Sequence, residues 1–143
     1  MGFGYSTRHQ EGAISVKQPL SVLGVTIEVR VSDFGAGAHW YTRMLGRPPD
    51  LTPRADFWEW EILPKCYLQV GQGTPATGSG PIRLGVADVA AERERVHDAL
   101  GVAVSEIERI EGVAAWCTFE DPFGNHLGLF EDLADVSSLD YPH

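Results

Sequence analysis

An internal repeat is the sequence feature that most constrains the fold of this chain. The stretch GVTIEVRVSDFGAGAHWYTRMLG (24–46) aligns without gaps with SGPIRLGVADVAAERERVHDALG (79–101), at an offset of 55 residues. In each copy, alternating apolar residues predict a strand, an aspartate predicts the start of a helix, and a Leu-Gly pair predicts its end. The paired identities are Val31/Val86, Asp33/Asp88, Ala36/Ala91, Leu45/Leu100 and Gly46/Gly101. The chain therefore holds two copies of a strand followed by a helix.

Further short strands are predicted after each helix. In the first copy they are FWEWEIL (57–63) and CYLQVG (66–71), and PDLTP (49–53) can add a short edge strand. In the second copy they are VAVSEIERI (102–110), VAAWCTF (113–119) and HLGLFE (126–131), with the turn DPFGN (121–125) before the last strand. Each half is thus a βαβββ unit. The Gly, Ser, Thr and Pro residues of GQGTPATGSG (71–80) predict a flexible connection between the units.

The two units and their strand endings resemble a known superfamily. VRVSD (29–33), LGVAD (84–88), WYTRMLG (40–46) and above all DPFGNHLGLFE (121–131) are similar to the vicinal oxygen chelate superfamily, which includes glyoxalase I, bleomycin-resistance proteins and extradiol dioxygenases. The resemblance implies an α+β fold in which two βαβββ units form a curved mixed-sheet cup with helices on the outer face. It implies one domain over residues 22–132, with units 22–71 and 79–132 and a linker at 72–78. Residues 1–21 are then an N-terminal extension and residues 133–143 a C-terminal tail.

In that superfamily, the first and last strands of each unit supply the ligands of a divalent metal inside the cup. The resemblance places these ligand positions at Thr26, Tyr67, Pro81 and Gly128, where Gly128 replaces the Glu of the DPxGNxxEL pattern. None of the four is a usual ligand for such a cation, which prefers carboxylate or imidazole groups. We therefore expect no metal and no other cofactor. If these ligand positions were assigned wrongly, a metal-dependent glyoxalase or dioxygenase would be the expected function.

Strand alternation predicts which polar side chains face the cup. If the apolar residues of 25–31 face their helix, Glu28 faces the other side, and the repeat places Arg83 at the equivalent position. His126 shares a face with Gly128 on the last strand, and Tyr67 shares a face with Gln69 in the first unit. Glu28, Arg83 and His126 are therefore candidate catalytic residues. The competing interpretation is that Glu28 and Arg83 only neutralise each other and that His126 is an exposed rim residue.

Tryptophan side chains are the candidate ligand contacts, together with Tyr67 and Gln69. Trp58 and Trp60 alternate with glutamates and share one face, and Trp116 lies in the matching part of the second unit. Aromatic planes on the cup face would stack on flat ligands or hold cations. The alternative is that these side chains fill the core or a dimer interface.

Charge and composition exclude some partners. The formal net charge of −9 and the absence of a basic cluster argue against nucleic acid. No apolar stretch approaches the roughly 20 residues of a membrane span, and no secretory signal is visible, so we expect neither a membrane partner nor export. Cys66 and Cys117 lie singly in apolar runs, which predicts buried free thiols and a cytoplasmic location.

The sequence therefore predicts a metal-independent protein that binds a small aromatic or cationic organic molecule in its cup, as in drug or metabolite sequestration. A metal-free lyase, isomerase or cyclase with Glu28 or His126 as acid or base and Arg83 as anion stabiliser is the main alternative. A regulatory module with a filled cup is the third. We expect a homodimer, the common arrangement in the superfamily, with residues 1–20 either a tail or an arm exchanged between subunits.

Overall fold

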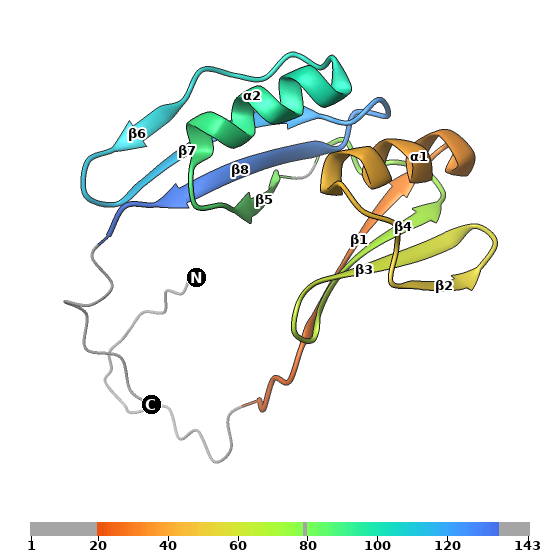
Figure 1. Ribbon diagram of the computed structural model, residues 1–143. Coiled ribbons are helices and arrows are strands. Elements are labelled where there is room, and N and C mark those ends of the chain that lie inside the picture. The colour runs from red at the N-terminus through yellow and green to blue at the C-terminus, as the bar shows by residue number, and fades with distance from the viewer. Residues whose placement is uncertain (1–19, 79, 135–143) are drawn as a thin grey trace.

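The computed structural model describes residues 20–78 and 80–134, and this part of the chain forms the two predicted units (Figure 1). The first unit contains β1 (Val25–Val31), α1 (Phe34–Leu45), β2 (Leu51–Arg54), β3 (Phe57–Leu63) and β4 (Cys66–Gln72). The second contains β5 (Ile82–Gly85), α2 (Val89–Leu100), β6 (Glu108–Ile110), β7 (Ala114–Glu120) and β8 (His126–Asp132). The α+β class and the βαβββ order are confirmed. The predicted N-terminal extension and the C-terminal tail lie almost entirely outside the described residues.

The two helices begin and end with the same residue types, as the repeat predicts. Asp33 and Asp88 are the N-caps, and their carboxylates accept hydrogen bonds from the backbone N–H groups of Ala36 and Ala91, at 3.1 and 3.0 Å respectively. Gly46 and Gly101 are the C-caps, with φ angles of 75° and 65° in the left-handed region, where glycine carries no steric cost. Local capping therefore fixes both helices at the same length of 12 residues.

Each unit forms its own four-stranded mixed sheet. The strand orders are β1-β4-β3-β2 and β5-β8-β7-β6, in which the first pair of each sheet is parallel and the remaining pairs are antiparallel. In Figure 1 both helices lie on one side of the molecule, and each covers one face of its own sheet. None of the helices in residues 20–78 and 80–134 is long and apolar enough to cross a membrane.

The face of each sheet that is turned away from its helix is here called its open face. Side chains on the first open face come from alternate residues of three strands: Thr26, Glu28, Arg30, Phe57, Glu59, Glu61, Tyr67 and Gln69. Those on the second are Arg83, Glu108, Ile110, Ala114, Trp116, Thr118, Glu120, His126, Phe130 and Asp132, with Gly85 and Gly128 between them. The predicted alternation of β1 is confirmed, because Val29 and Val31 are buried while Glu28 and Arg30 are exposed.

The turn DPFGN joins the second unit to the first through buried hydrogen bonds. Oδ2 of Asp121 accepts a hydrogen bond from the Tyr41 hydroxyl of α1 at 2.8 Å and another from Asn125 Nδ2 at 2.7 Å. Asn125 Nδ2 also donates to the Arg30 carbonyl of β1 at 2.9 Å. Burial, followed by the adjacent Asp121 carboxylate, raises the pKa of Tyr41 well above its usual range. The turn predicted before the last strand is therefore also a contact between the two units.

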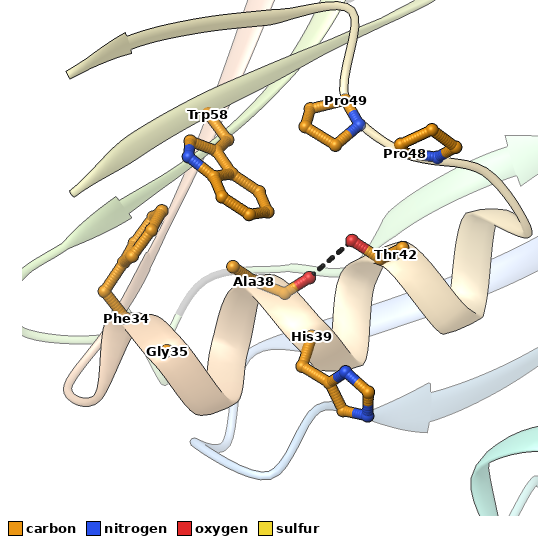
Figure 2. A pocket seen from close by; sticks show the side chains of 8 residues that line it. All are labelled: Phe34, Gly35, Ala38, His39, Thr42, Pro48, Pro49 and Trp58. Atoms are coloured by element: carbon orange, nitrogen blue, oxygen red, sulfur yellow. Dashed lines mark hydrogen bonds between the residues drawn. The ribbon is translucent and has the colours of Figure 1, made fainter. Parts of the chain in front are cut away.

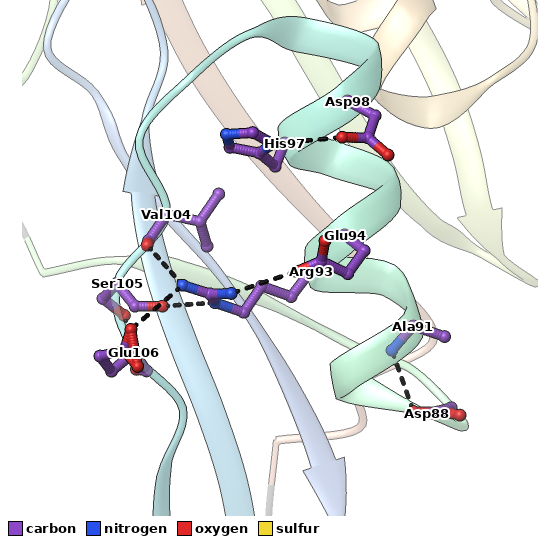
Figure 3. A network of polar contacts seen from close by, with 9 residues as sticks. All are labelled: Asp88, Ala91, Arg93, Glu94, His97, Asp98, Val104, Ser105 and Glu106. Carbon is purple, nitrogen blue, oxygen red and sulfur yellow. Dashed lines mark hydrogen bonds and ion pairs between the residues drawn. The ribbon is translucent and has the colours of Figure 1, made fainter.

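Arginines complete the packing around the helices. Arg95 of α2 donates to the Met44 carbonyl at the end of α1 at 2.8 Å, and Arg43 of α1 donates to the Ala99 carbonyl at the end of α2. Arg93 donates to the Ser105 and Val104 carbonyls at 2.7 and 3.1 Å (Figure 3). The N–H of Ser105 still donates to the Thr118 carbonyl of β7 at 2.9 Å, but the carbonyls of Val104 and Ser105 bind Arg93, and the strand predicted over 102–110 forms only at Glu108–Ile110.

Candidate functional site

The centre of the second open face is built around Arg83. In the parallel pair of β5 and β8, Arg83 lies opposite Gly128. A Cβ atom on Gly128 would lie 3.0 Å from Arg83 Cγ and 2.7 Å from the Cys117 carbonyl oxygen. Glycine at position 128 therefore lets the Arg83 stem lie directly against the backbone of β8, and a larger residue would displace it.

Two aromatic rings stand beside Arg83 on the same face. Phe130 of β8 and Trp116 of β7 are cross-strand partners, and the Phe130 ring lies over Gly85, where an added Cβ would be 2.8 Å from the ring. Arg83, Trp116, Phe130 and Ala114 line a cavity of about 430 Å³. This volume lies within the range of small-molecule sites, and a mostly apolar lining with one charged group is their usual composition.

The first open face has a different chemistry, dominated by carboxylates that already have partners. Glu28 accepts a hydrogen bond from Arg30 Nε at 3.2 Å, and Glu59 accepts one from Gln69 Nε2 at 3.0 Å. A hydrogen bond to the Glu61 carboxylate is the main cause that raises the pKa of Tyr67. This face is therefore a network of polar side chains that bond to one another.

Strand register revises one of the four ligand positions carried over from the superfamily. Glu28 and Arg83 are related by the repeat, and their strand partners are Gln69 and Gly128, respectively. Gln69, and not Tyr67, is therefore the first-unit equivalent of Gly128. The revised set is Thr26, Gln69, Pro81 and Gly128, which still contains no carboxylate or imidazole. Within residues 20–78 and 80–134, no group of three or more His, Cys, Asp or Glu side chains is placed to hold a metal ion.

The three candidate catalytic residues have separate surroundings. Glu28 is bonded to Arg30, whereas Arg83 lines the cavity with the two aromatic rings. His126 lies at the start of β8, where its Nε2 is 3.1 Å from the Thr77 carbonyl and its Nδ1 is 3.7 Å from the Glu120 carboxylate. Neither Glu28 nor His126 lines the cavity around Arg83, and the described residues show no ion pair between Glu28 and Arg83.

Of the three tryptophans predicted to contact a ligand, two lie on the helix side of the first sheet and one lies on the open face of the second sheet. Trp60 has no exposed surface, and its Nε1 donates to the Arg47 carbonyl at 3.0 Å, so it is a core residue as the alternative interpretation held. Trp58 also faces α1, where its ring meets Phe34 at a centroid distance of 5.4 Å. Figure 2 shows Trp58 above the helix, in a separate cavity of about 370 Å³ beside Pro48 and Pro49. Trp116 alone of the three lies on an open face.

Phe130 and Ala114 are the lining residues that sequence reasoning did not select. Alternation along the last strand does put Phe130 on the face of Gly128. The missing information was the pairing of Phe130 with Trp116, which brings the two rings together. The alternation of residues along the last strand thus indicated the face of Phe130, but its position beside Trp116 depends on the register between β7 and β8.

Solved structures of other proteins share this arrangement over nearly their whole length. A glyoxalase/bleomycin resistance protein from Catenulispora acidiphila superposes with a TM-score of 0.63 and is 26% identical, covering 77% of this chain and 98% of its own. The chain has the vicinal oxygen chelate fold. No protein-family model and no curated protein matches it.

Two further proteins with the vicinal oxygen chelate fold show how varied its functions are. An antibiotic-binding protein from a Streptomyces species has a TM-score of 0.64 and 20% identity, and the match covers 80% of this chain and 99% of that protein. A lactoylglutathione lyase from Agrobacterium tumefaciens has a TM-score of 0.63 and 17% identity, with coverages of 85% and 100%. At these identities the likeness concerns the fold, so function has to be argued from the residues of the site.

Proposed function

We propose that this protein binds a small aromatic organic molecule on its second open face and does so without a metal. The cavity lined by Arg83, Ala114, Trp116 and Phe130 is the observation that carries this proposal. Its aromatic walls offer flat surfaces for stacking, which is worth about 0.5–1.5 kcal/mol per aromatic pair beyond the area buried. Arg83, the one charged residue that lines it among residues 20–78 and 80–134, would orient the ligand.

The donor set supports metal independence. Thr26, Gln69, Pro81 and Gly128 offer no charged or imidazole ligand, and divalent cations in proteins depend on such groups. Gly128 is also packed too closely to be replaced by the Glu of the superfamily pattern without moving Arg83. The chemistry of metal-dependent glyoxalases and dioxygenases is therefore not assigned to this chain.

Sequestration of an antibiotic or a metabolite is the biological role that we propose for this binding. The structural neighbour described as an antibiotic-binding protein gives the proposal a precedent on the same fold. The homodimer and the cytoplasmic location expected from the sequence stay predictions. Sedimentation of the purified protein and fractionation of cells test them.

A thermal-unfolding screen tests the proposed function. A ligand that binds only the folded protein raises the unfolding midpoint, by an amount that grows with ligand concentration. The purified protein is heated with aromatic metabolites and antibiotics, each with a chelator and with an added divalent metal. We expect shifts with aromatic compounds that are the same in both conditions. A shift that needs the metal would contradict the proposal and restore the metal-dependent enzymes as the leading function.

The metal-free enzyme stays a separate prediction that the geometry does not favour. Proton transfer requires the acid or base to be within hydrogen-bond reach of the substrate, directly or through one water. Glu28 and His126 do not line the cavity that would hold the ligand. Each compound found in the screen should therefore be recovered unchanged after incubation with the protein, and product formation that is lost in Glu28→Gln or His126→Gln would contradict this expectation.

A further inference from the structure

We infer that the ligand of the second open face is a planar aromatic acid, whose anionic group pairs with Arg83. This inference rests on the proposed function and adds the charge of the ligand. It depends on three observations: where Arg83 is held, which groups are available to it, and what surrounds it.

Arg83 is an exposed residue of the cavity lining, and the shape of β8 positions its stem. Its stem lies against the bare backbone at Gly128, with Thr118 on the far side, where a Cβ on Gly128 would be 3.5 Å from the Thr118 methyl group. The stem of an arginine can pack on neighbouring surface while its guanidinium stays in water. The contact at Gly128 therefore positions the base of the Arg83 side chain and leaves its guanidinium accessible to a ligand.

The guanidinium of Arg83 has no hydrogen-bond or ion-pair partner among residues 20–78 and 80–134, in contrast to the guanidinium groups of Arg30 and Arg93. Arg30, on the first open face, is paired with Glu28 at 3.2 Å. Arg93 is surrounded by two carbonyls and two carboxylates (Figure 3). Arg83 thus brings N–H donors to the lining of the cavity, and a guanidinium can accommodate a carboxylate in a bidentate pair.

The remaining lining determines the rest of the ligand. Trp116 and Phe130 present ring surfaces and Ala114 presents a methyl group, so a flat hydrocarbon framework fits there. A cationic ligand would place its charge beside Arg83. Glu108 and Asp132 lie on the same face, opposite Trp116 and Ala114, but among residues 20–78 and 80–134 no carboxylate lines the cavity itself. An aromatic ring that bears a carboxylate or a phenolate matches both parts of the lining. The ring stacks on Trp116 and Phe130, and the anionic group pairs with the guanidinium of Arg83.

Three naphthalene probes of nearly equal size separate charge from shape: 2-naphthoate, 2-naphthamide and 2-naphthylmethylammonium. Titration calorimetry measures their dissociation constants with the full chain at pH 7 and low salt. We expect 2-naphthoate to bind at least about tenfold more tightly than 2-naphthamide, as a charge-assisted hydrogen bond provides, and the ammonium probe to bind most weakly. Raising the salt to about 0.5 M should weaken only 2-naphthoate, because screening acts on the charged pair.

Two variants test whether the preference for 2-naphthoate depends on Arg83. In Arg83→Gln the preference for 2-naphthoate over 2-naphthamide should fall to within about twofold, while 2-naphthamide keeps its affinity. Arg109→Gln is the matched control, because Arg109 is exposed on the same sheet but pairs with buried Ala115 and therefore faces away from the cavity. This control should retain the wild-type preference.

The outcomes distinguish the two proposals. Equal binding of all three probes, or a preference for 2-naphthoate that survives in Arg83→Gln, would overturn the inference and leave aromatic binding intact. Failure of every probe to bind at millimolar concentration would instead contradict the proposed function itself. Circular dichroism of each variant confirms that the fold is retained.

Discussion

Replacement of Tyr41 by phenylalanine should weaken the contact between the two units by a measurable amount. The hydroxyl of Tyr41 donates to Asp121 Oδ2 at 2.8 Å, and both residues are buried, with exposed fractions of 0% and 4%. Asp121 would retain three donors: the backbone N–H groups of Phe123 and Asn125, and Asn125 Nδ2. Tyr41→Phe therefore removes one hydrogen bond to a charged group without emptying the site, which costs about 2 kcal/mol.

Urea unfolding followed by circular dichroism measures this loss. The midpoint should fall while the slope with urea stays the same, because the folded and unfolded states keep their exposed areas. At a few degrees per kcal/mol for a chain of this size, the thermal midpoint should fall by roughly 6 °C. The matched control is Tyr67→Phe, which removes a hydroxyl from the first open face and should change the midpoint much less. A Tyr41→Phe protein as stable as wild type would refute the account of the DPFGN turn as a structural contact.

Three further predictions follow from the same structure. Burial raises the pKa of Tyr41 in the folded protein, so the hydroxyl loses its proton at lower pH in the unfolded chain than in the folded one. Above pH about 10 the free energy of unfolding of the wild type should therefore fall by about 1.4 kcal/mol per pH unit more than that of Tyr41→Phe. Urea unfolding at a series of pH values measures this difference. Gly128→Ala should lower the free energy of unfolding by about 1–3 kcal/mol, because its Cβ would meet the Cys117 carbonyl at 2.7 Å, and wild-type stability would contradict that packing. Asp88→Ala should cost about 1 kcal/mol through the lost N-cap of α2, and helix content by circular dichroism should fall with it.

The helices were predictable from the sequence because their signals are local. An aspartate before each helix and a glycine after it supply the caps, and neither depends on the rest of the fold. The strand over 102–110 was predicted too long, because the carbonyls that Arg93 binds lie 11 and 12 residues away from it. Hydrophobic periodicity describes neighbouring residues along the chain and does not predict a contact between a side chain and a carbonyl that far away in the sequence.

The site was only partly predictable, for two physical reasons. Alternation shows that Trp58 and Trp60 share a face, but not which face the helix covers, and here the helix covers the aromatic side. The equivalence of Gln69 with Gly128 follows from the pairing of β1 with β4 and of β5 with β8. The sequence repeat does not extend to β4 and β8, because the segments that precede these two strands differ in length. Arg83, in contrast, was correctly placed on the open face, since its strand lies inside the repeat.

The central claim is metal-independent binding of an aromatic ligand at Trp116 and Phe130. The most direct test is the dissociation constant of one aromatic compound from the thermal screen, measured by calorimetry with a chelator and with a divalent metal. We predict the same value in both conditions, a loss of about tenfold in Trp116→Ala, and no loss in Trp58→Ala, whose side chain lies on the helix side of the first sheet. Binding that disappears with the chelator, or that survives in Trp116→Ala and is lost in Trp58→Ala, would contradict the account.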